Sequence, residues 1–114
     1  MMTNCPFCRI VEGEEDARIV YQDDDVTAFH DANPVAPVHV LVVPNRHIER
    51  AAAVEAEDEP VLGRLFVAAR QVAEAQGVAD GYRLVVNSGR PAGQSVFHLH
   101  VHLLGGRSFT WPPG

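Results

Sequence analysis

The sequence predicts an α+β domain with an antiparallel sheet. Apolar residues recur at three- and four-residue spacing across residues 58–76, which predicts one long amphipathic helix. Short runs of strand-forming residues stand on both sides of that helix, an order typical of an α+β chain. The 114 residues contain no internal repeat and no linker, so we expect a single domain over residues 1–114.

The chain begins with a predicted short helix and a hairpin. Residues 6–11 fit one helical turn that ends at Gly13. Residues 18–21 and 26–30 are typical of two strands, and the polar residues 22–25 between them are typical of a turn. We expect the acidic side chains of this turn to be solvated rather than to bind a metal.

A central strand is predicted after a proline-containing loop. Two prolines within residues 33–37 exclude that stretch from a hydrogen-bonded ladder. Residues 38–43 are strongly apolar and are closed by Pro44, which favours a central position in the sheet.

The long helix has signals at both ends. Pro60 fits the first turn, and Gly77 fits the residue just past the last turn. The apolar positions with helical spacing are Leu62, Leu65, Phe66, Ala69, Val72 and Ala73.

Two further strands are predicted after the helix. Residues 82–87 return to alternation, and residues 88–94 are typical of a loop. A last strand is expected from Ser95 through three histidines to the glycines at 105–106, followed by a stiff tail at 111–114.

Charge restricts the class of ligand. Fifteen acidic residues stand against nine basic ones, and the basic residues, all arginine, form no run. A protein that binds a nucleic-acid polymer needs a basic patch, so a small ligand is the better expectation. No window approaches ~18 consecutive apolar residues and the N-terminus has no signal-peptide pattern, so we expect a cytoplasmic protein without membrane contact.

Three of the six histidines, His98, His100 and His102, alternate with apolar residues. Alternate residues of a strand share a face, so we expect three imidazoles on one wall. A neutral imidazole can attack phosphorus and divide a nucleotidyl transfer into two easier steps. The residues just before, Gly93, Gln94 and Ser95, offer two unhindered amides and a hydroxyl to the developing charge. A single strand histidine is usually structural, but three adjacent buried rings would need polar partners.

The two cysteines, Cys5 and Cys8, form a C-x-x-C pattern. In a chain without an export signal this pattern fits a redox pair, half of a metal site, or no function. Two thiolates at this spacing can bind one ion, and tetrahedral zinc needs two further ligands, which His47 and His98 can supply.

The chain resembles the histidine-triad (HIT) superfamily. The three alternating histidines with their apolar neighbours through Leu104 are similar to the superfamily's motif of three histidines spaced by apolar residues. Further segments resemble the histidine-triad nucleotide-binding (Hint) branch, and the Trp-Pro-Pro-Gly ending favours it over dinucleoside polyphosphate hydrolases of the Fhit type. These segments are residues 29–31, 36–39, 44–48, 87, 93–97, 104–107 and 111–114.

The resemblance implies a purine nucleoside phosphoramidase, which cleaves the P–N bond of nucleoside 5′-phosphoramidates or hydrolyses aminoacyl-adenylates. His100 would attack the α-phosphorus and carry the nucleotidyl group until water removes it. His102 would bind the phosphate, Ser95 would reach the leaving amine or a phosphate oxygen, and His39 would assist proton transfer. The alternative is a nucleotide-binding or partner-binding module with incidental turnover.

The resemblance also implies the contacts of the nucleotide. Asp31 would hold the ribose hydroxyls. The other implied residues are Ile10, Phe29 and His30 around the base, and Asn87, Gly93 and Gln94 with Ser95, His100 and His102 at the phosphate.

Zinc-carrying members of the superfamily imply a structural Cys2His2 site of Cys5, Cys8, His47 and His98. The family fold implies a five-stranded antiparallel sheet with a short N-terminal helix and one long helix. It further implies a homodimer whose sheets form one ten-stranded surface, with residues 105–114 contributing to the dimer and to the edge of the active site.

Overall fold

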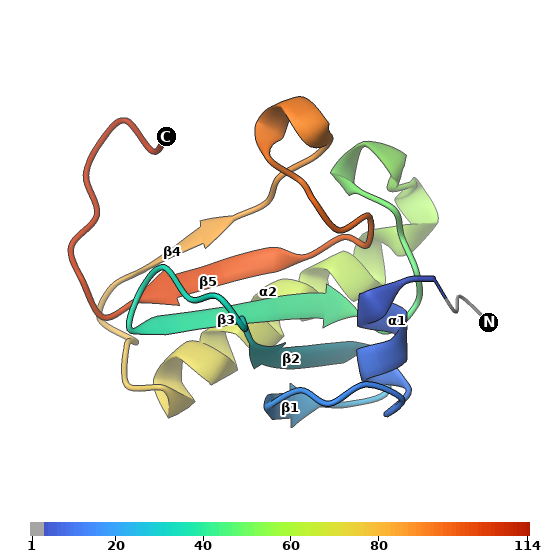
Figure 1. The fold of residues 1–114 in the computed structure, drawn as a ribbon, viewed down its shortest axis with the longest axis horizontal. Coiled ribbons are helices and arrows are strands. Elements are labelled where there is room, and N and C mark those ends of the chain that lie inside the picture. Colours follow the sequence, from blue (N-terminus) through green and yellow to red (C-terminus); the bar gives the residue numbers. More distant parts are fainter. Residues whose placement is uncertain (1–3) are drawn as a thin grey trace.

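The computed structural model describes residues 4–114 and contains one five-stranded sheet with a helix on each face (Figure 1). All neighbouring strands are antiparallel, in the order β1-β2-β3-β5-β4. The elements are α1 (Pro6–Val11), β1 (Ile19–Gln22), β2 (Val26–His30), β3 (Val38–Pro44), α2 (Glu59–Ala75), β4 (Tyr82–Val85) and β5 (Val101–Gly105). The predicted fold class, with its long helix and short N-terminal helix, is confirmed.

Helix α2 covers one face of the sheet and forms the larger core. Pro60 lies in its first turn, as predicted. At its end the Val78 N–H donates to Ala73 O at 2.9 Å and Gly77 adopts a φ of 79°, a conformation that favours glycine. The buried core residues are Val26, Ala28, Val40, Val42, Ile48, Leu65, Ala68, Ala69, Val72, Ala73, Leu99, Val101 and Leu103.

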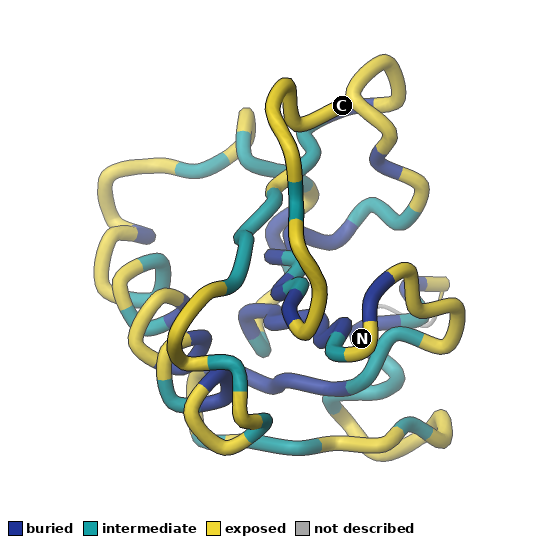
Figure 2. Tube along the Cα trace, turned by 90° about the vertical axis from the view of Figure 1, so that its left-hand side faces the viewer, coloured by how far each residue is buried: buried dark blue, intermediate teal, exposed yellow. Residues whose placement is uncertain are grey.

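The opposite face carries α1 and a smaller core. Cys5, Phe7 and Cys8 pack there against Phe29 of β2 and against Leu41 and Val43 of β3. Strand β3 is therefore buried on both faces, as Figure 2 shows for the centre of the sheet, and the predicted central position is confirmed. The C-terminal segment over residues 106–114 is mostly exposed (Figure 2).

The last strand is shorter than predicted. Its first pair with β3 is Val42 with Val101, so His98 and His100 precede the ladder, and the expectation of a strand from Ser95 is wrong for residues 95–100. The side chains still alternate in direction before the strand begins. Leu99 and Val101 belong to the core that α2 covers, whereas His98 and His100 are buried outside that core. The strand predicted over 82–87 likewise ends at Val85.

Three short 3-10 helices are additional to the predicted elements: η1 (Ala51–Ala53), η2 (Ala56–Asp58), which overlaps the predicted long helix at Asp58, and η3 (Arg90–Ala92). No helix within the described residues is long and apolar enough to cross a membrane.

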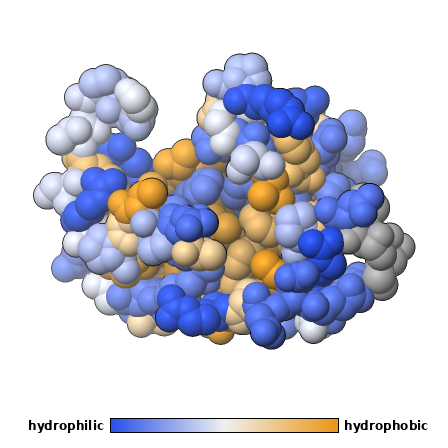
Figure 3. Space-filling model, viewed as in Figure 1, coloured by the Kyte–Doolittle hydropathy of each residue, from blue (hydrophilic) through white to orange (hydrophobic). Residues whose placement is uncertain are grey.

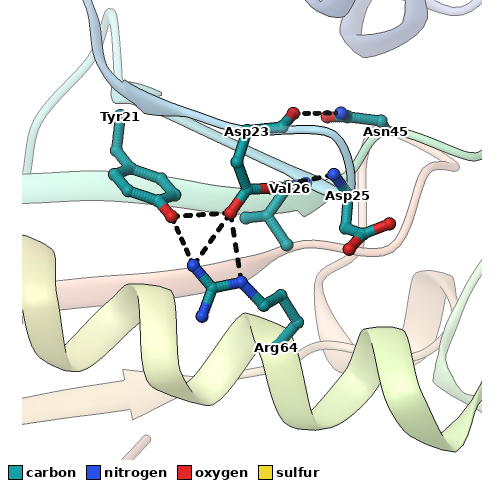
Figure 4. Close-up of polar contacts among 6 residues, drawn as sticks. All are labelled: Tyr21, Asp23, Asp25, Val26, Asn45 and Arg64. Carbon is teal, nitrogen blue, oxygen red and sulfur yellow. Dashed lines mark hydrogen bonds and ion pairs between the residues drawn. The ribbon is translucent and has the colours of Figure 1, made fainter.

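The acidic turn after β1 is an anchor rather than merely a solvated loop (Figure 4). Asp23 Oδ1 accepts hydrogen bonds at 2.8 Å from the N–H groups of both Asp25 and Val26. Its Oδ2 accepts from the Tyr21 hydroxyl at 2.6 Å and from Arg64 of α2 at 2.9 Å. Burial opposes ionisation, but these hydrogen bonds outweigh it and hold the pKa of Asp23 well below its usual range. This turn belongs to neither of the two metal-compatible clusters found among residues 4–114.

Candidate active site and metal centre

A cavity of about 650 Å³ opens on the α1 face of the sheet. Figure 3 shows hydrophobic side chains in the hollow at the centre of this face, with hydrophilic ones around them. Ile10, Phe29 and Leu41 give the cavity apolar walls, whereas His100 and His102 form part of its polar lining. Its volume and mixed lining suit a small-molecule ligand.

Most of the predicted ligand-binding residues meet at this cavity. Its lining includes Ile10, Phe29, His30, Asp31, Ser95, His100 and His102. His39 lies behind His102 instead, with its Nε2 atom 2.9 Å from His102 Nδ1.

Three predicted phosphate-binding residues lie outside the cavity lining. The Gln94 side chain is buried and committed to backbone: it accepts from the Gly89 N–H at 2.8 Å and donates to Glu49 O and Val96 O, both at 3.0 Å. Asn87 lies on the same loop, with Nδ2 3.9 Å from where a Cβ on Gly93 would stand. The side chain of Gln94 therefore shapes the loop that precedes Ser95.

The backbone fixes the tautomer of His100. Its Nδ1 lies 2.7 Å from the carbonyl oxygen of His98, and since a carbonyl can only accept, Nδ1 carries the proton. In the neutral ring the Nε2 atom then holds a lone pair. Burial lowers the pKa of His100, which favours that neutral ring.

A second hydrogen-bonded chain fixes His102. The Val35 N–H donates to His39 Nδ1 at 3.1 Å, so neutral His39 carries its proton on Nε2. That Nε2–H lies 2.9 Å from His102 Nδ1 and 3.3 Å from Asp31 Oδ2. His102 Nδ1 therefore accepts, and its own proton resides on Nε2.

The rings of this chain are neutral at physiological pH. The pKa of His102 is lowered to about 4 by burial, with further lowering from nearby His100 and His39. Burial also lowers the pKa of His39, against a smaller opposing effect of Asp31.

The four predicted metal ligands come together beside α1. One ligand atom from each of Cys5, Cys8, His47 and His98 lies within 4.8 Å of the others. His98 Nδ1 is 3.2 Å from His47 Nδ1 and 3.3 Å from Cys5 Sγ, and Cys8 Sγ is 3.4 Å from His47 Nδ1. In a tetrahedral zinc site the ligand atoms are about 3.3–3.8 Å apart, so these residues fit such a metal.

His98 is prepared for coordination through Nδ1. Its Nε2 lies 2.8 Å from Pro44 O and must donate, which leaves a lone pair on Nδ1. Burial raises the pKa of Cys8 to about 12, with further raising by the hydrogen bond and the charge of Cys5. A cation between the two sulfur atoms would oppose that effect and stabilise the thiolates.

Asp31, His39 and His102 form a second cluster of metal-compatible groups. His39 does not fit a metal through Nε2, because the Val35 N–H already uses the lone pair of Nδ1 and places the proton on Nε2. This cluster is a hydrogen-bonded chain.

Some cavity residues are absent from the sequence-based prediction. Phe7, Arg18 and Asn33 also line the cavity. The one available signal was the position of Phe7 inside the C-x-x-C pattern, which brings any residue there close to the metal ligands.

The fold and site define a class of α+β proteins in which histidines at the start of an interior strand of the sheet face a ligand cavity beside a Cys2His2 cluster. The HIT domain model matches residues 12–109, and the chain belongs to the HIT family. An uncharacterized HIT-like protein of Synechocystis sp. is 50% identical over 108 residues, which are 95% of each chain.

Solved structures agree with this assignment. A HIT family hydrolase from Legionella pneumophila is 45% identical with a TM-score of 0.95, over 97% of this chain and 100% of that chain. A histidine triad nucleotide-binding protein from Candida albicans is 26% identical with a TM-score of 0.82, over 95% of this chain and 82% of that chain.

Proposed function

We propose that the protein is a purine nucleoside phosphoramidase, which hydrolyses the P–N bond of nucleoside 5′-phosphoramidates or the P–O bond to the acyl group of aminoacyl-adenylates. The observation that carries the proposal is the 2.7 Å contact between His100 Nδ1 and His98 O. This contact leaves the Nε2 lone pair of a cavity-lining ring available as a nucleophile. The hydrolase names of the similar Legionella and Clostridium thermocellum proteins support the same class of reaction.

The reaction divides into two displacements at phosphorus. His100 Nε2 forms a bond to the α-phosphorus while the P–N bond breaks, and the amine leaves with a proton that the Ser95 hydroxyl relays from solvent. Water then attacks the same phosphorus, breaks the bond to Nε2, releases the nucleoside monophosphate and returns one proton to solvent. His102 donates its Nε2–H to a phosphate oxygen, and His39 holds His102 in that tautomer. The Ser95 hydroxyl, in the same cavity, donates to the leaving nitrogen or to a phosphate oxygen.

We propose that the rest of the cavity binds the nucleoside. Ile10, Phe29 and the backbone of His30 enclose the base, and Asp31 accepts from the ribose hydroxyls. Asn87 supplies a phosphate contact, whereas Gly93 and Gln94 shape the loop before Ser95, because their N–H groups already donate to Arg90 O and Gly89 O. The Candida albicans relative, a histidine triad nucleotide-binding protein, supports this class of ligand.

We propose that the Cys2His2 cluster binds a structural zinc ion. Cys5, Cys8, His47 and His98 would hold the ion, which would link α1, the segment after β3 and the histidine motif. The interatomic distances and the bare Nδ1 of His98 support this assignment.

We propose a homodimer that extends the sheet. Strand β4 is an edge strand, paired only with β5 in the described residues, and Val86 beside it is 42% exposed. Trp111, at 83% exposure, gives the C-terminal tail an aromatic group suited to an interface. Sedimentation should give about twice the 12.4 kDa chain mass, and a mass of one chain would contradict the dimer.

The decisive experiment is turnover of adenosine 5′-phosphoramidate by wild-type protein and by His100→Asn. We expect the variant to lose at least about a thousandfold in kcat, because the nucleophile is removed. Mass spectrometry of wild-type protein quenched with denaturant at alkaline pH, where the bond between phosphorus and imidazole survives, should show a nucleotidyl adduct on His100. Nucleotide binding without turnover would instead favour the binding-module alternative.

A further inference from the structure

The segment that carries the proposed nucleophile lies outside the sheet. The ladder between β3 and β5 begins at Val101, so strand pairing does not fix the ring of His100. Backbone contact before the ladder comes from the Leu99 N–H, which donates to Ile48 O at 2.6 Å. Other groups must therefore orient His100.

Phe7 is in contact with this ring. The ring centroids of Phe7 and His100 are 5.2 Å apart with an interplanar angle of 90°, an edge-to-face arrangement. Phe7 also meets the ring of His98 at 5.9 Å and the ring of Phe29 at 5.3 Å. Its side chain is buried, with 8% exposure, so it has few alternative positions.

The position of Phe7 is fixed by its neighbours in the chain. Cys5 caps α1 and accepts from the Cys8 N–H at 3.3 Å, and both cysteines belong to the metal-compatible cluster. Phe7 lies between them, and His98, a third member of that cluster, holds the other side of His100 through its carbonyl oxygen. His100 is thus constrained at Nδ1 by His98 and across its ring by Phe7.

We propose that Phe7 is a positioning residue for the nucleophile, which holds the His100 ring in line with the phosphorus. This inference rests on the proposed function. A ring free to turn about its Nδ1 contact would spend less time in the attacking orientation, which lowers kcat and leaves nucleotide affinity largely unchanged. A mere wall of the nucleotide cavity would affect KM instead.

The test compares Phe7→Met with Val11→Ala. Methionine keeps the volume of Phe7 and removes its ring, whereas Val11→Ala loosens the same helix by shortening another side chain that packs on this core. We expect Phe7→Met to lower kcat on adenosine 5′-phosphoramidate about tenfold with KM changed less than about twofold, and Val11→Ala to keep the wild-type kcat. The rate of adduct formation on His100 in a single turnover should fall by the same factor.

Thermal unfolding and bound metal per chain are measured on each variant, and Phe7→Leu is a second variant should Phe7→Met unfold. A kcat loss that only follows a loss of bound metal would overturn the inference, as would a raised KM with unchanged kcat. A wild-type protein without turnover overturns the proposed function and the inference with it. Wild-type turnover with an unchanged kcat in both Phe7 variants overturns the inference alone.

Discussion

The Nε2 atom of His39 on β3 lies 2.9 Å from the Nδ1 atom of His102 on β5. The adjoining Val35 N–H donates to the other nitrogen of His39, so a backbone amide outside the cavity sets the direction of the whole chain of hydrogen bonds. His102 consequently presents a donor, while His100 presents a lone pair. The imidazoles of His100 and His102 therefore differ in hydrogen-bonding role, one as an acceptor and the other as a donor.

Replacement of His39 should impair catalysis without removing a group that touches the substrate. We expect His39→Phe to lower kcat about 10- to 100-fold, because His102 would no longer be held with its proton on Nε2. His39→Gln should retain more activity, since its amide nitrogen can still donate to His102 Nδ1. Steady-state kinetics on a nucleoside phosphoramidate check this expectation, and equal losses in both variants would contradict it.

The fold was predictable because its signals are local. Helical spacing over residues 58–76, Pro60 and Gly77 define α2 without reference to any other part of the chain. The start of β5 is not local: it depends on where β3 and β4 supply partners, and those partners begin opposite Val101 and His102. A two-residue period in the sequence therefore indicates that alternate side chains share a face. It does not indicate that the residues are hydrogen-bonded to a neighbouring strand.

The sequence predicted which residues form the candidate site better than it predicted the contacts that hold them in place. The spacing of Cys5 and Cys8, with His47 and His98, indicated a cluster that the structure assembles. The contact of Gln94 with Glu49 O and the ring contact of Phe7 with His100 depend on tertiary packing, because these partners are distant in the sequence. The other partners of the Gln94 side chain, Gly89 and Val96, are near it in the sequence. Side chains whose role is to hold others leave little sequence signal.

The buried neutral state of His102 should make stability depend on pH. Its folded pKa of about 4 lies below its usual 6.5, so its contribution is fully present above pH 6.5 and is lost as the pH falls toward 4. We expect the free energy of unfolding of wild type to fall between pH 7.5 and 5 by about 1 kcal/mol more than that of His102→Gln, allowing for partial exposure of the ring. Urea titrations at both pH values measure the difference, and parallel losses would exclude this linkage.

The anchor of the acidic turn should contribute to stability but not to catalysis. Asp23→Ala removes the acceptor for two backbone N–H groups and for Arg64, and we expect a loss of about 1–3 kcal/mol in the free energy of unfolding. Asp24→Ala is the matched control, because that neighbouring side chain is exposed and should change stability by less than about 0.5 kcal/mol. Urea unfolding measures both, and an Asp23→Ala protein as stable as the control would refute the anchor.

Removal of the metal should loosen the N-terminal helix. Purified wild-type protein should contain about one zinc ion per chain, whereas Cys8→Ser should contain almost none, because three ligands hold the ion far less tightly than four. Since the proposed zinc ion would bind the folded cluster and not the unfolded chain, treatment with a chelator should lower the unfolding temperature of wild type by at least about 5 °C. The same treatment should leave the unfolding temperature of Cys8→Ser nearly unchanged.

Glu14→Ala, an exposed change just after α1, is the control and should retain both the metal and the response to chelator. Elemental analysis measures the bound metal, and thermal unfolding measures the response to the chelator. Wild-type protein that contains no metal and whose unfolding temperature does not change with chelator would instead favour a redox role for Cys5 and Cys8.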